Sequence, residues 1–126
     1  MLSTMPTARH SSAAVHIPLF GDLILGGIAK RNRLRTAELL NTLEMNNGRD
    51  GMWRNIIYMI KPRWNPSAVY FDNCIFVVSP EESTMEMLPI RGGQFGQWTL
   101  LRGCDTPNQW PSSMCVHNGH ILLAGE

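Results

Sequence analysis

Residues 59–63 read Met-Ile-Lys-Pro-Arg and repeat the Met-x-x-x-Arg spacing of residues 5–9, Met-Pro-Thr-Ala-Arg. Each copy is followed by a run of small residues, an apolar run, a Thr-x-Glu-x-Leu element and a tryptophan. The matching positions are separated by 54 residues (Arg9 to Arg63), 48 (Glu38 to Glu86), 47 (Val69 to Val116) and 45 (Trp53 to Trp98). Ordered elements that recur at one roughly constant period indicate a repeat architecture.

The recurring elements are typical of β-strands. Asn118-Gly119 lies between apolar residues, which is the strongest short-range signal for a two-residue hairpin. Asp72-Asn73 occupies the same place in the second repeat, and both residue types tolerate left-handed backbone. The continuous apolar run Ile75–Val78 is typical of a strand that is buried on both faces. Each repeat therefore predicts a strand, a tight turn and a second, buried strand.

The segment 36–45 leaves an alternative open. Its residues, Thr-Ala-Glu-Leu-Leu-Asn-Thr-Leu-Glu-Met, favour a helix by propensity alone. The match to Thr84–Leu88, where β-propensity is higher, favours a strand.

The elements together resemble the Kelch repeat family. In that family an Arg stands near the start of each blade, a diglycine ends an apolar strand, and a Trp lies on the last strand. The intact diglycine here is Gly26-Gly27, which permits positive φ and close approach of a neighbouring segment. The positions that carry the repeat are Arg9, Gly26, Gly27, Glu38, Trp53, Glu86, Trp98, Asn118, Gly119 and Gly125.

The resemblance implies an all-β fold: a partial β-propeller with two four-stranded antiparallel blades and a third half-blade hairpin. We expect blade 1 at about residues 5–58, blade 2 at about 59–102 and the half blade at about 107–126. Propellers close with four to eight blades, so the chain is expected to be an incomplete Kelch propeller, a fragment of a longer protein or the product of an incomplete gene model. Assembly with other copies of the chain is the alternative. The second diglycine is replaced by Ser79-Pro80 and the third repeat has Trp110 in place of Arg, which mark a diverged member.

Composition excludes several classes of function. A net charge of +1 gives no reason to expect nucleic-acid binding. No stretch has the length of a membrane span or the apolar core of a secretion signal. Three cysteines without paired spacing predict a reducing, cytoplasmic location rather than a disulfide framework. The charge is nevertheless uneven, because residues 1–63 carry nine Lys/Arg and four Asp/Glu whereas residues 64–126 carry two and six.

Catalytic and metal-binding patterns are weak. Cys115-x-His117-x-x-His120 is the only metal-like cluster, and no fourth ligand has a recognisable spacing. Serine, histidine and aspartate residues occur without a nucleophile elbow. We therefore predict no enzyme activity, no metal and no cofactor.

The basic run at residues 30–35, Lys-Arg-Asn-Arg-Leu-Arg, directly follows the diglycine. In the Kelch family the loop at this position and the loop joining one blade to the next open onto the same face. This predicts one positive patch for acidic peptides, because arginine pairs with carboxylates, formed by Lys30, Arg31, Arg33, Arg35, Lys61 and Arg63. The alternative is that these side chains lie in solvent and serve only solubility.

The function implied by the resemblance is protein–protein recognition. By the same resemblance, the full-length protein is a substrate-recognition adaptor of a cullin-type ubiquitin ligase. Attachment to actin or the cytoskeleton is an alternative, and a propeller domain of an oxidase-type enzyme is a more distant one.

Overall fold

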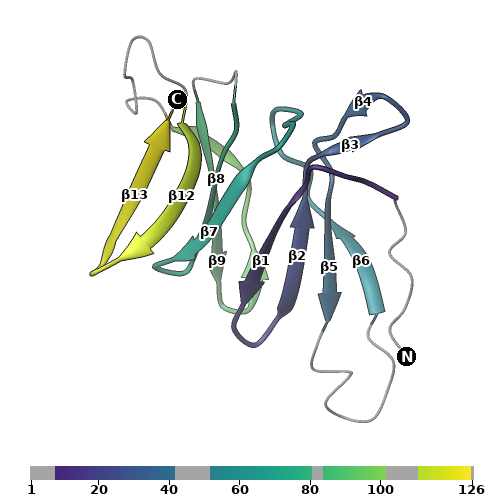
Figure 1. Cartoon of the computed structure of the whole chain (residues 1–126). Coiled ribbons are helices and arrows are strands. Elements are labelled where there is room, and N and C mark those ends of the chain that lie inside the picture. The colour runs from purple at the N-terminus through teal and green to yellow at the C-terminus, as the bar shows by residue number, and fades with distance from the viewer. Residues whose placement is uncertain (1–7, 42–51, 81–83, 102–110, 126) are drawn as a thin grey trace.

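The protein is an all-β structure of antiparallel sheets, as predicted from the repeat (Figure 1). The computed structural model describes residues 8–41, 52–80, 84–101 and 111–125, and within these ranges there is no helix.

The first sheet has four strands in the order β1-β2-β5-β6, and every neighbouring pair is antiparallel. The strands are β1 (Ala13–Ile17), β2 (Gly21–Leu25), β5 (Ala37–Asn41) and β6 (Met52–Ile56). In β2 alternate side chains are buried, as expected when one face of a strand covers a core. β5 pairs with β2 along its whole length, so the strand prediction is confirmed over Ala37–Asn41, whereas residues 42–45 lie outside the described ranges.

The second sheet repeats this order. β7 (Ser67–Phe71), β8 (Cys74–Val78), β9 (Met85–Arg91) and β11 (Thr99–Leu101) pair in sequence as antiparallel neighbours. β10 (Gln94–Phe95) pairs with the far end of β9, so this sheet has five strands, one more than the repeat predicts. In the chain, a two-stranded hairpin follows β2 and precedes β5 of the first sheet. Its strands are β3 (Ile28–Ala29) and β4 (Asn32–Arg33).

The third unit is the hairpin of β12 (Pro111–His117) and β13 (His120–Gly125). Its turn, Asn118-Gly119, has φ values of 51° and 75°, and the Asp72-Asn73 turn between β7 and β8 has 53° and 60°. Both predicted two-residue hairpins are therefore confirmed. Gly125, matched to the diglycine position, lies at the end of β13 and pairs with Pro111.

The first strands of the three units lie beside one another, β1 against β7 and β7 against β12 (Figure 1). Because each is the edge strand of its own sheet, the units converge along these edges. The core fills the space between the first two sheets with side chains from both, including Ile17, Leu23, Leu39, Ile75, Val77 and Leu88.

The two repeat tryptophans differ in their surroundings. Trp98 is 6% exposed, lies one residue before β11 and joins the core between the sheets. Its indole N–H donates to the carbonyl of Ile57 at 2.9 Å, across to the segment after β6. Trp53 lies on β6 and is only partly buried.

The diglycine has the predicted backbone conformation, with φ of 66° at Gly26 and 92° at Gly27. A Cβ added at Gly27 would lie 2.5 Å from the carbonyl oxygen of His10, and one at Gly26 would lie 2.8 Å from that of Arg63. The amide of Gly27 donates to the Arg63 carbonyl at 2.7 Å. The absence of side chains thus lets the connection between the sheets pass directly over this turn.

Candidate protein-binding site

Two buried Arg–Glu pairs mark corresponding places in the two repeats. Arg9 forms an ion pair with Glu38, and Arg63 pairs with Glu86 at 2.8 Å from Nε to Oε2; all four side chains have no exposed surface. In both repeats the Thr two residues before the Glu also accepts from the arginine. Each Thr stands one residue before the strand that carries the Glu. A spacing of two residues in extended backbone places both side chains on one face, so one Thr-x-Glu element presents the Thr hydroxyl and the Glu carboxylate together.

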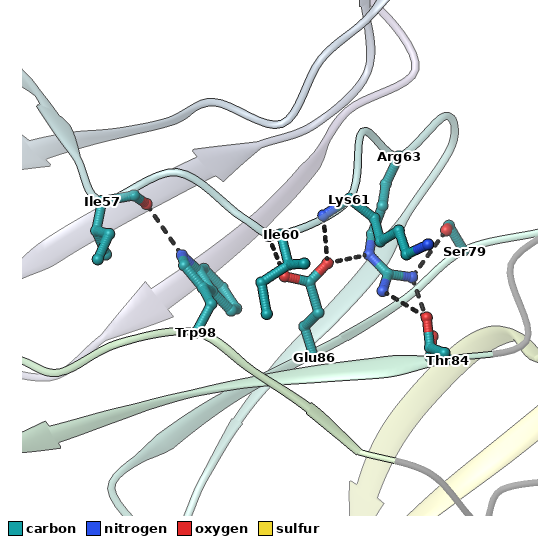
Figure 2. Close-up of polar contacts among 8 residues, drawn as sticks. All are labelled: Ile57, Ile60, Lys61, Arg63, Ser79, Thr84, Glu86 and Trp98. Atoms are coloured by element: carbon teal, nitrogen blue, oxygen red, sulfur yellow. Dashed lines mark hydrogen bonds and ion pairs between the residues drawn. The ribbon is translucent and has the colours of Figure 1, made fainter.

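The second pair holds the segment that connects the sheets (Figure 2). One carboxylate oxygen of Glu86 accepts the amide of Ile60, and the other accepts the amide of Lys61 at 3.2 Å as well as Nε of Arg63. The guanidinium also donates to the Ser79 hydroxyl at 3.0 Å. A carboxylate from the second sheet therefore fixes the backbone of residues 60–63.

Arg63 does not belong to the predicted positive patch. Its side chain has no exposed surface and its charge is compensated by Glu86, so that part of the prediction is wrong. The sequence did contain a signal: an Arg and a Thr-x-Glu element recur together, and opposite charges that repeat in step indicate a pair. Arg9 and Arg63 are equivalent repeat positions, and both are internal.

The remaining cations lie on two segments that the structure brings together. Residues 30–35 form the β3–β4 hairpin and the strand entry after it, at the same end of the sheets as the β6–β7 connection (Figure 1). The amide of Met59 donates to the Arg35 carbonyl at 2.8 Å, and the amide of Arg63 donates to the Leu34 carbonyl at 2.9 Å. The prediction that these loops lie together is confirmed.

Five predicted patch residues reach the surface at this end. Lys30, Arg31, Arg33 and Arg35 are exposed, and Lys61 is partly buried. Lys30 and Arg31 form the two-residue turn between β3 and β4, with φ of 49° and 68°. This left-handed backbone is unusual for residues with long side chains, and it places two cations at the tip of a hairpin.

Apolar side chains accompany the cations, and sequence reasoning missed them. Ile57, Tyr58 and Ile60 are 41%, 52% and 40% exposed, and all three precede Lys61 on the connecting segment. The guanidinium of Arg35 lies 5.7 Å from the centre of the Tyr58 ring, within the range of a cation–π contact. We call the surface of Lys30, Arg31, Arg33, Arg35, Tyr58 and Lys61 the basic face.

The metal-like cluster is on the third hairpin. His117 and His120 are directly paired across the turn, and Cys115 lies two residues before His117 on β12. All three are exposed, yet the described part of the chain contains no group of three His, Cys, Asp or Glu side chains arranged to hold a metal ion.

Within the described part of the chain, no helix has the length and apolar character needed to cross a bilayer.

No protein-family model matches the chain, and no curated protein matches it significantly.

Proposed function

We propose that the chain is a protein-recognition module of the Kelch propeller type, and that its basic face binds an acidic peptide segment of a partner protein. Two features of the fold support the propeller interpretation. The two larger sheets share one strand order, and the first strands of all three units lie side by side, as they would around a central axis. The buried Arg–Thr–Glu contacts recur at equivalent positions in both sheets.

The observation that carries the binding proposal is the junction of the two basic segments. Backbone hydrogen bonds join residues 34–35 to residues 59 and 63, so the cations stand on a braced surface rather than on independent loops. Preorganised charge lowers the entropy cost of binding and raises association rates for oppositely charged partners. The basic face also contains Tyr58 and Arg35, and tyrosine and arginine are among the residue types that most often dominate binding energies at interfaces.

The Kelch resemblance extends the proposal to a longer protein that contains this chain. As the Kelch resemblance implies, such a module would select the substrate of a cullin-type ubiquitin ligase, with the basic face as the selecting surface. In this proposal the chain binds its partner and catalyses no reaction.

The test is a binding titration with a probe of defined chemistry. A fluorescein-labelled peptide of alternating Glu and Leu is titrated with the chain at low and at moderate salt, and polarisation gives the dissociation constant. We expect the Arg31→Glu/Arg33→Glu/Arg35→Glu variant to bind roughly threefold to a hundredfold more weakly, because three surface charge pairs at about 0.2–1 kcal/mol each, about 0.6–3 kcal/mol together, are lost. Affinity of the unchanged chain should fall with salt.

The matched control is Arg54→Glu, which reverses another exposed cation, on β6 of the first sheet, and is compared with the single variant Arg31→Glu, which changes the net charge by the same amount. Arg54→Glu should leave the affinity within about twofold. An equal affinity of the triple variant and the unchanged chain at low salt would refute the proposal, and an equal loss in Arg54→Glu and in Arg31→Glu would show that only net charge matters.

A further inference from the structure

The turn between β1 and β2 places a leucine where the backbone favours glycine. The amide of Phe20 donates to the carbonyl of Ile17 at 3.0 Å, and Leu19 has φ of 69°. With Pro18 before it, Leu19 occupies the third position of a type II turn, which requires positive φ and normally holds Gly or Asn. Leu19 is also 83% exposed, so its side chain contributes little to the fold.

A groove opens beside this turn. The β1–β2 turn lies at the end of the sheets opposite to the β3–β4 hairpin (Figure 1). The volume of the groove is about 690 Å³, within the range of ligand-binding clefts. It is lined by the β1–β2 turn of the first sheet and by the β7–β8 and β9–β10 turns of the second. We call it the turn groove, and its apolar wall contains Leu19, Phe20, Tyr70 and Ile90.

Contacts within the walls keep the turn groove open. The rings of Phe20 and Phe95 lie 5.2 Å apart and tie the first turn to the second sheet. The Tyr70 hydroxyl donates to the side-chain carbonyl of Asn73 at 3.0 Å, and the amide of Ile90 donates to the Asn73 backbone carbonyl at 2.9 Å. These bonds join the β7–β8 turn to β9, so the wall is formed before any ligand arrives.

The charges of the turn groove define its ligand further. Arg91 is the one cation among the lining residues; it is exposed and makes no ion pair with any other residue that the structure describes. Among the described residues that line the groove, Asp72 is the one carboxylate, and it is also exposed. Cys74 lies between these influences: burial, then Asp72, raises the pKa of its thiol, whereas Arg91 lowers it. The thiol is therefore neutral near pH 7, and Arg91 is left to attract an anion.

We propose that the turn groove binds an extended peptide segment of a partner protein, with an apolar side chain against Leu19, Phe20 and Tyr70 and a single carboxylate at Arg91. Asp72 disfavours a run of acidic residues, so this ligand differs from the one proposed for the basic face. The strained, exposed leucine agrees with this role, because natural sequences break local rules chiefly where function requires it.

The test begins with a phage-displayed library of random twelve-residue peptides selected on the immobilised chain. We expect enrichment of peptides with an apolar or aromatic residue close to one Asp or Glu. An enriched peptide is then titrated by fluorescence polarisation against three variants. Leu19→Gly and Arg91→Glu should each weaken binding about tenfold or more, whereas Arg31→Glu/Arg33→Glu/Arg35→Glu should leave it unchanged.

Thermal unfolding separates a binding role from a structural one. Leu19→Gly should melt at the same temperature as the unchanged chain or higher, because glycine relieves the positive φ; Leu19→Asn, which also tolerates this backbone, provides a second variant. Loss of affinity with retained stability supports the proposal. It is overturned if no peptide is enriched, or if enriched peptides bind Leu19→Gly and Leu19→Asn as tightly as the unchanged chain. If the enriched peptides are acidic and lose affinity only for the triple variant, the turn-groove proposal is overturned and the basic-face proposal stands.

Discussion

Replacing Glu86 by Gln tests whether the buried Arg–Glu pair stabilises the junction between the connecting segment and the second sheet. Glu86 and Arg63 have no exposed surface, and the carboxylate accepts from Arg63 Nε and from the amides of Ile60 and Lys61. Glutamine has nearly the same shape but carries no charge, and its NH₂ group would face a donor where the carboxylate now accepts. The change leaves the Arg63 guanidinium buried without its counter-charge.

The expected loss in the free energy of unfolding is about 3–5 kcal/mol, the usual cost of removing one partner from a buried ion pair. A small domain has a total stability of about 5–15 kcal/mol, so the variant should unfold at a much lower denaturant concentration. Urea unfolding followed by tryptophan fluorescence measures this, because Trp98 donates to the same connecting segment. The midpoint should fall while the dependence on urea stays the same.

A double-mutant cycle identifies the source of the loss. Arg63→Met should cost a similar amount to Glu86→Gln, since it leaves the Glu86 carboxylate buried without its cation. The combined variant should lose less than the two changes added together, by at least about 1 kcal/mol, because residues in contact are coupled. A loss below about 1 kcal/mol in Glu86→Gln, or additive effects, would refute the inference that this pair stabilises the junction.

The equivalent pair of the first repeat supplies a comparison. Arg9 Nε and Glu38 Oε2 have no hydrogen-bond partner among the described residues, whereas both oxygens of Glu86 accept. We therefore expect Glu38→Gln to lose about 1 kcal/mol less than Glu86→Gln, the contribution of about one hydrogen bond. Equal losses at the two sites would show that charge alone decides the cost.

Three further changes test the fold and its surface. Gly27→Ala should cost at least about 2 kcal/mol more than Gly119→Ala, because a Cβ collides with backbone only at Gly27 while both positions have positive φ; equal melting temperatures would contradict this. Trp98→Ala should lose about 3–5 kcal/mol. Trp98→Phe should lose less, because it keeps a large ring although it removes the indole hydrogen bond; a tolerated alanine would show that the core does not need the ring. Iodoacetamide should modify exposed Cys115 before Cys74, because burial raises the pKa of the Cys74 thiol. The rate of modification at Cys74 should increase only at higher pH. Mass spectrometry of the two peptides measures the order of modification, and earlier modification of Cys74 would contradict the prediction.

Local residue chemistry determined the strands and their turns. Asp72-Asn73 and Asn118-Gly119 demand or tolerate positive φ wherever they occur, so the two hairpins could be predicted without knowing what surrounds them. The period of the repeat placed a strand at Ala37–Asn41 against its helical propensity, because an alignment between repeats carries information that a single segment lacks. The proximity of residues 30–35 to the connecting segment was also expected, as an implication of the Kelch resemblance, in which these two loops open onto the same face.

Burial and exposure of single side chains were decided by the tertiary structure. The recurrence of Arg63 with the Thr-x-Glu element indicates a pair, but only the packing of the second sheet against the connecting segment supplies the buried acceptors, Glu86 and Ser79. The tertiary structure also decided the surroundings of Tyr58. Nothing in the composition of the chain gives a reason to expect this side chain in solvent beside Arg35. The backbone conformation of Leu19 could not be predicted for a related reason. Its positive φ arises from closing a turn between paired strands, and leucine has no preference for that conformation. Sequence determines what each residue tolerates, and the packing of one sheet on another selects among those tolerated states.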